Sequence, residues 1–202
     1  QTIVNISCII LFLPLVGKIA QLMEKIYKGK SVISLRLHKT NPSERKPALE
    51  AMEEDTKAFI GLVFHFCESA VHIDHHEESG ELAKQLSSKP MNEKYIMLKH
   101  IHGELHNFYI EIRHKSLNTQ DVERLERLMG CSRNALYAAK SIKDGVEDIE
   151  QLSNSSNDLK YNYYIKAKNS IAGFTSNARK ILLNPVQEED FEAITVLFRN
   201  VQ

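Results

Sequence analysis

Two carboxylates in the second half of the chain are placed to share a cation. Asp144 and Asp148 are four residues apart, which puts both on one face of a helix, about one turn apart. Glu147 and Glu150 add negative charge nearby. Carboxylate oxygens suit hard divalent cations such as Mg²⁺ and Mn²⁺, and iron less well. The spacing predicts a metal-binding pair at Asp144 and Asp148, and the competing interpretation is an exposed acidic stretch in which Lys140 pairs with Asp144.

The nine histidines offer a second set of candidate ligands. Glu68, His72 and His76 follow one another at i, i+4 and i+8 and share a helical face. His102 and His106 form another i, i+4 pair. Such pairs can bind transition metals, and imidazole is also the side chain that titrates near neutral pH. His102 lies on an apolar stripe, which favours a core or boundary histidine over a ligand.

The sequence contains no complete set of residues for a di-iron site or for nucleophilic catalysis. Glu111 and His114 have the i, i+3 spacing of di-iron bundle ligands, but that chemistry needs the motif on two helices and the chain carries it on one. Cys67 lies next to Phe66 on an apolar face and Cys131 is isolated, so no nucleophile set stands out, and the glycines form no phosphate-cradling loop. The sequence therefore predicts a protein that is not an enzyme.

The elements that must position these residues are helices. Apolar residues recur in alternating steps of three and four, which is typical of helices packed at small crossing angles. Three runs show the pattern: Met52, Thr56, Phe59, Val63, Phe66, Ala70, Ile73; Met91, Tyr95, Leu98, His102, Leu105, Tyr109, Ile112; and Val122, Leu125, Met129, Ser132, Leu136, Ala139, Ile142, Val146, Ile149. The only strand-like window is a weak one at 31–37. We expect an all-α fold, a bundle of long antiparallel helices whose core includes Phe59, Phe66, Leu98, Leu105, Leu136 and Val146.

Helix boundaries follow from proline, cap residues and polar loops. Pro47 opens the first helix, which we expect to run to about His76, and Lys89–Pro90 begins the second. Asn118 or Thr119 caps the third, and the polar loop at 153–158 separates it from a fourth helix over 159–183. A fifth helix follows Asn184–Pro185 and reaches the last residue, which leaves a continuation of the bundle open.

Composition and charge narrow the class of protein. Of the 202 residues, 43% are hydrophobic and 26% are charged, which is the mixture of a folded globular chain. The 26 basic and 26 acidic residues cancel, so there is no overall bias toward nucleic acid as a partner. Three widely spaced cysteines (Cys8, Cys67 and Cys131) fit a reducing compartment better than a disulfide framework.

The first 46 residues differ in character from the rest. Eleven of the fourteen residues from 3 to 16 are aliphatic, Phe or Cys, and eight basic residues against two acidic ones follow between Lys18 and Lys46. An apolar helix followed by a basic stretch predicts a transmembrane helix over 1–27, with the basic juxtamembrane linker 28–46 on the cytoplasmic side. Such a linker attracts anionic lipid. The alternatives are a buried core helix and, less consistent with the flanking charges, a secretory signal peptide.

Three segments together resemble one family. The stretch QTIVNISCIILFLPLVGKIAQLMEK resembles the last transmembrane helix of bacterial sodium/phosphate cotransporters. KPALEAMEEDTKAF resembles the start of the PhoU-like helical domain that follows it in that family. LERLMGCSRNALYAAKSIKDGVEDIEQL resembles the most recognisable part of the same domain, and YNYY at 161–164 falls where the family has a similar tyrosine.

This resemblance implies a location, partners and a role. It implies a PhoU-like bundle over 47–202 in the cytoplasm, attached to the cell inner membrane, with a regulatory or structural function in sodium-dependent phosphate transport. The expected partner is the transmembrane core of the same transporter, and a homodimer is left open. PhoU proteins hold metal on acidic i, i+4 pairs, which Asp144 and Asp148 match in type and place.

The chain also departs from the family, because the Gln-Ser-Ser signature of the transport sites is missing. Its nearest match, Gln85–Ser88, lies in a polar stretch between predicted helices. We therefore expect the C-terminal portion of such a transporter without its transport core. The alternative is a soluble helical-bundle metal-binding protein whose first helix is buried.

Overall fold

The computed structural model describes residues 17–18, 33–73, 80–115 and 117–183. The chain divides into two compact units, Gln1–Ile33 and Ser34–Gln202, and every helix named below belongs to the second. The predicted membrane helix over 1–27 lies outside the described residues apart from Gly17 and Lys18, and so do His76 and the predicted fifth helix after Leu183. None of the helices in the described part of the chain combines the length and apolar character that a membrane crossing requires.

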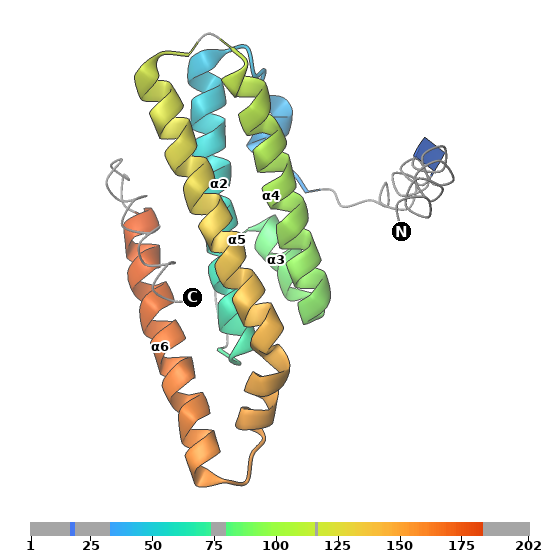
Figure 1. Ribbon diagram of the computed structural model, residues 1–202, viewed down its shortest axis with the longest axis vertical. Helices are drawn as coiled ribbons and strands as arrows, with labels where there is room; N and C mark the ends of the chain where they lie inside the picture. The colour runs from blue at the N-terminus through green and yellow to red at the C-terminus, as the bar shows by residue number, and fades with distance from the viewer. Residues whose placement is uncertain (1–16, 19–32, 74–79, 116, 184–202) are drawn as a thin grey trace, which may run out of the picture. The chain divides into compact units, whose positions relative to one another are not determined.

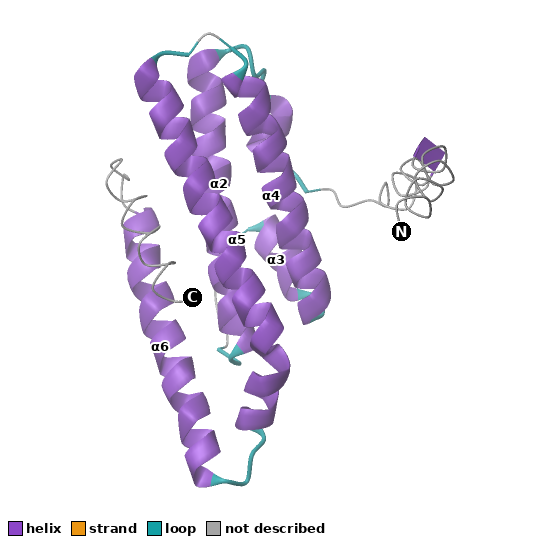
Figure 2. Ribbon diagram, viewed as in Figure 1, coloured by secondary structure: helices purple, strands orange, loops and turns teal. Residues whose placement is uncertain are grey.

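The described residues of the second unit form helices joined by loops and turns, with no strand among them, which confirms the predicted all-α class (Figure 2). Its elements are a 3-10 turn η1 (Arg36–Lys39) and the helices α2 (Arg45–Ala70), α3 (Glu81–Ser87), α4 (Met91–Arg113), α5 (Thr119–Ser153) and α6 (Asp158–Leu183). The weak strand signal at 31–37 is therefore not realised in its described part, since η1 begins at Arg36. The polar stretch around Gln85 forms the short helix α3 between α2 and α4.

The long helices form an antiparallel bundle, as predicted. In Figure 1, α2, α4, α5 and α6 alternate in direction along the chain. Helices α2, α4 and α5 all contact one another, whereas α6 contacts α2 and α5. The bundle thus has a three-helix core with a fourth helix laid along one edge of it.

The core forms mainly along the predicted stripes of α2 and α4. Phe59, Phe66, Leu98 and Leu105 are fully buried. Leu136 is only half-buried, which corrects its predicted place in the core. From residue 131 onward the buried residues of α5 are small, namely Cys131, Ser132, Ala135, Ala138 and Ala139. Small side chains allow the α5 backbone to approach its neighbours closely.

The last part of α5 departs from prediction for a second reason. Val146 is half-buried, and no residue from Lys140 to Ser153 is buried. Helix α5 has 35 residues, whereas α4, which runs antiparallel to it, has 23. The end of α5 therefore extends past the helices that would cover it, as Figure 1 shows, and its apolar stripe remains partly exposed.

Helix α2 ends six residues earlier than predicted, at Ala70. The N–H of Ile73 donates to the carbonyl oxygen of Glu68 at 3.0 Å, and the N–H of His72 donates to that of Ser69 at 3.3 Å. This is the pattern of a Schellman C-cap, in which the residue after the cap is left-handed. His72 has that conformation, with φ of 54°, in a place where glycine is usual.

The start of α5 agrees with its predicted cap. The Asn118 side chain accepts a hydrogen bond from the N–H of Asp121 at 2.8 Å, which satisfies one of the unpaired N–H groups of the first turn. The negative charge of Asp121 in that turn also suits the helix dipole.

Residues Ser34–Thr40, hereafter the strap, lie on the bundle. They fall within the range 28–46 predicted as a linker, but Leu35 and Leu37 are buried. The Asp55 carboxylate of α2 accepts hydrogen bonds from the N–H of Arg36 at 3.2 Å and of Leu37 at 2.9 Å. Burial raises the pKa of Asp55, and these two hydrogen bonds oppose the rise. The compact bundle unit therefore begins at the strap, ahead of Pro47.

Candidate functional site

The predicted metal pair lies on the surface of α5. Asp144 and Asp148 are both exposed. The Nζ of Lys143, and not that of Lys140, lies 3.2 Å from Oδ1 of Asp144. Asp144, Glu147 and Lys143 line a depression of about 510 Å³ beside the first residues of α4. Among the described residues, no group of three or more His, Cys, Asp or Glu side chains is arranged to hold a metal ion, so the pair remains a prediction.

Glu68, near the end of α2, and His72, just beyond it, both contact α6. Glu68 is buried, and one of its carboxylate oxygens lies 2.6 Å from a guanidinium nitrogen of Arg179. The Tyr164 hydroxyl donates to the carbonyl oxygen of Val71 at 3.0 Å and lies 3.2 Å from Nδ1 of His72. These contacts attach α6 to the C-terminal end of α2.

The end of α2 gains one more contact from α6. Lys168 donates from Nζ to the His72 carbonyl oxygen at 2.6 Å. That carbonyl belongs to the left-handed residue that closes the helix, so the strained turn is held from outside by a charged donor. Glu68 and His72 thus take part in the packing of α6, while His76, the third residue of that predicted face, lies outside the described residues.

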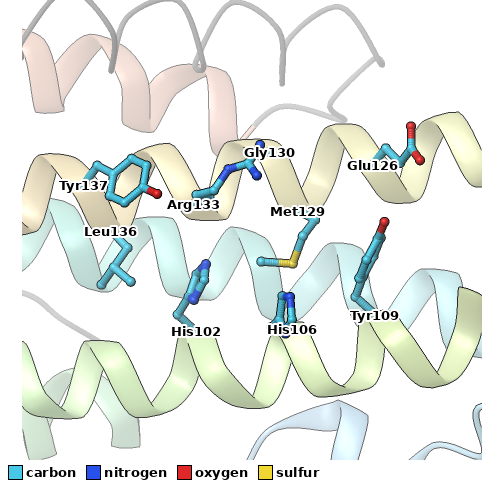
Figure 3. Close-up of a pocket in the computed structure, with 9 residues that line it drawn as sticks. All are labelled: His102, His106, Tyr109, Glu126, Met129, Gly130, Arg133, Leu136 and Tyr137. Atoms are coloured by element: carbon cyan, nitrogen blue, oxygen red, sulfur yellow. The ribbon is translucent and has the colours of Figure 1, made fainter. Parts of the chain in front are cut away.

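A groove between α4 and α5 brings together side chains of more varied chemistry. Its volume is about 490 Å³, within the usual range of small-molecule sites. In Figure 3, His102 and His106 reach from α4 toward α5, while Met129 and Leu136 reach from α5 toward α4. The full set that lines it is His102, His106, Tyr109, Glu126, Met129, Gly130, Arg133, Leu136 and Tyr137.

His102 is the most perturbed group in this groove. Its Nε2 atom is buried and has no hydrogen-bond partner among the described residues. Burial, together with the smaller effects of the neighbouring charges of His106 and Arg133, lowers the pKa of His102 to about 4. Its ring also contacts Phe59 of the core, with centroids 6.0 Å apart. His102 is therefore a neutral imidazole at neutral pH, between the core and the groove.

The polar groups of the groove divide into satisfied and unsatisfied ones. Arg113, at the end of α4, donates to the Tyr109 hydroxyl at 2.8 Å and lies 3.3 Å from a Glu126 carboxylate oxygen. Arg133 and Tyr137 are one helical turn apart on α5 and exposed. Neither of their side chains has a hydrogen-bond or ion-pair partner among the described residues.

Sequence reasoning identified part of this site. The i, i+4 spacing of His102 and His106 marked one wall, and the structure places both there. Arg133, Tyr137 and Glu126 come from another helix, and no local spacing relates them to the histidines. One signal in the sequence could have indicated Arg133. Every other arginine and lysine of this helix has an acidic residue within four positions, whereas Arg133 has none.

Comparison with protein-family models, with curated proteins and with solved structures finds no match for this chain. The fold and the groove define its class: an all-helical bundle protein with a ligand-sized groove between two of its core helices.

Proposed function

We propose that this chain is a regulatory and structural region of a sodium-dependent phosphate transporter of the inner membrane. In this proposal, residues 1–27 form a membrane helix, and the bundle is a cytoplasmic PhoU-like domain without catalytic activity. Support comes from the fit between the resemblance and the helices: residues 46–59 coincide with the start of α2, and residues 125–152 lie within α5.

The observation that carries the proposal is the attachment of the strap. A regulatory domain can act on the segment before it only if the connection between them transmits a change in the bundle. The strap is buried at Leu35 and Leu37 and is hydrogen-bonded to Asp55, so a shift of α2 would move Ser34 with it. A freely solvated linker would absorb such a shift.

Phosphate uptake by cells tests the transport part of the proposal. The complete reading frame that contains this chain is expressed in cells lacking their own phosphate uptake, and entry of radiolabelled phosphate is measured with and without sodium. We expect sodium-dependent uptake, and a changed uptake rate in Asp55→Ala, which loosens the strap. Absence of phosphate uptake, or identical uptake in Asp55→Ala, would overturn the proposal.

Membrane fractionation tests the location. The whole chain should sediment with membranes, and Ile10→Arg should shift it toward the soluble fraction, since an arginine at the centre of a membrane helix costs about 2.5–3.5 kcal/mol. Lys99→Arg, an exposed change on α4, is the control and should leave the distribution unchanged. Recovery of the unaltered chain in the soluble fraction without detergent would contradict the proposed membrane helix.

A further inference from the structure

The groove between α4 and α5 has an uneven supply of hydrogen-bonding groups. Its strongest acceptors, the Glu126 carboxylate and the Tyr109 hydroxyl oxygen, both already interact with Arg113. The negative charge of Glu126 is therefore balanced by Arg113. A ligand would therefore interact mainly with the polar groups of the groove that have no protein partner among the described residues.

Those remaining groups are mainly donors. The Arg133 guanidinium carries five N–H groups and has no protein partner among the described residues. Tyr137, one turn further along α5, offers its hydroxyl and lines the same groove (Figure 3). From the opposite wall, His106 offers its ring, and Nε2 of His102 is buried with no hydrogen-bond partner in the part of the chain that the structure describes.

We infer that this groove binds a small organic anion through its phosphate or carboxylate group, with Arg133 as the principal contact. A planar guanidinium forms paired hydrogen bonds with either group, and these charge-assisted bonds are stronger than those between neutral groups. The hydroxyl of Tyr137 and the ring of His106 are further polar groups that line the same groove. The inference depends on the groove alone and not on the proposed function.

The size and lining of the groove indicate an organic body on the ligand. At about 490 Å³, the groove is larger than a single inorganic anion needs. Met129 and Leu136 supply apolar surface beside the donors. A ligand that carries an apolar or aromatic body should cover these side chains and bind more tightly than inorganic phosphate.

Isothermal titration of the whole chain with phenyl phosphate, benzoate and inorganic phosphate tests the inference. We expect phenyl phosphate or benzoate to bind with a dissociation constant below about 10 mM, and inorganic phosphate to bind roughly tenfold more weakly or not detectably. The two organic probes decide whether phosphate or carboxylate is preferred. Absence of binding by both organic probes, or equally tight binding of inorganic phosphate, would overturn the inference as stated.

Removal of the guanidinium locates the binding. Arg133→Met should weaken the better organic probe roughly tenfold or more. Lys140→Met is the matched control, since it removes one positive charge from the exposed surface of the same helix without lining the groove. Equal weakening by both variants would mean that the anion responds to overall charge, which contradicts a site at Arg133.

A second variant fills the groove without touching the charge. Gly130 lines the groove, and a Cβ atom built there meets nothing within 4 Å, so Gly130→Leu should fold normally and obstruct the ligand. Gly145→Leu, on the same helix and equally open at Cβ but outside the groove, is its control. Loss of binding in Gly130→Leu alone is the expected result, and unchanged binding in that variant would place the anion elsewhere.

Discussion

The carboxylate of Asp55, in the middle of α2, accepts a hydrogen bond from the N–H of Leu37 at 2.9 Å. It accepts a second one from the neighbouring N–H of Arg36 at 3.2 Å. One side chain of the bundle thus caps a helical turn that lies eighteen residues earlier in the chain. The relationship explains why residues predicted to be a linker have a defined place on the bundle.

Replacement of Asp55 should therefore release the strap. Asp55→Ala leaves two backbone N–H groups without their acceptor, which costs about 1–3 kcal/mol in the free energy of unfolding. Urea denaturation measures this change. Glu54→Ala is the control, because among the described residues Glu54 makes just an exposed ion pair with Arg36, and its loss should cost less than about 1 kcal/mol. Equal effects of the two substitutions would mean that the Asp55 hydrogen bonds do not hold the strap.

Phe59 should be among the most sensitive core positions. Its side chain is fully buried on α2 and contacts the His102 ring, so Phe59→Ala should lower the free energy of unfolding by about 3–5 kcal/mol. Ile96→Ala, at a side chain that is 54% exposed, should cost well under about 1 kcal/mol. Chemical denaturation of both variants checks the pair, and a small effect at Phe59 would contradict the helix register.

The stability of the bundle should fall as His102 takes up a proton. Its pKa is lowered to about 4 in the folded chain, against an ordinary value of 6.5. Between these values the unfolded chain binds the proton and the folded chain does not, so the free energy of unfolding decreases as the pH falls through this window. Allowing for partial exposure of the ring, the loss should be about 1–2 kcal/mol.

The variant His102→Leu should lack this part of the pH dependence. Urea denaturation of the wild type and the variant at pH 7 and at about pH 4 makes the comparison. The two proteins share every other titrating group, so the difference between their pH profiles reports His102. Parallel profiles would show that His102 has the same proton affinity in the folded and unfolded chains.

The attachment of α6 should depend on one hydroxyl group. Tyr164 is buried and donates to the carbonyl oxygen of Val71 at 3.0 Å, so Tyr164→Phe should destabilise the chain by about 1–2 kcal/mol. Tyr163→Phe changes the neighbouring tyrosine, which is 67% exposed, and should have no measurable effect. Thermal melts compare the two, and no loss in Tyr164→Phe would show that the hydrogen bond is not needed to hold α6.

The acidic pair on α5 can be tested with metal ions. Asp144 and Asp148 repel each other by a few tenths of a kcal/mol when no cation is present. A divalent ion that binds them only in the folded chain would raise the melting temperature of the wild type by mass action. Melting curves with and without about millimolar Mn²⁺ or Mg²⁺ should show this shift in the wild type and not in the Asp144→Asn, Asp148→Asn double variant. Equal shifts in both proteins would leave the pair as ordinary surface charge.

Local patterns in the sequence determined most of the helical framework. The spacing of Phe59, Phe66, Leu98 and Leu105 predicted which faces of α2 and α4 are buried, because one helical period decides which side chains share a face. Asn118 and the loop before Asp158 predicted where α5 begins and ends, because caps and polar turns act on their own neighbours. These features need no knowledge of distant residues.

Only the tertiary structure decided which groups from different helices meet. Glu68 looked like a metal ligand beside His72, but its partner is Arg179, 111 residues away. The strap donates hydrogen bonds to Asp55, and His102 of α4 lines the same groove as Arg133 and Tyr137 of α5. Such meetings depend on how far each helix is rotated about its axis and how closely it approaches its neighbour. In α5 that approach is set by small residues such as Ala135 and Ala139, whose contribution depends on what lies opposite them and has no signature in local spacing.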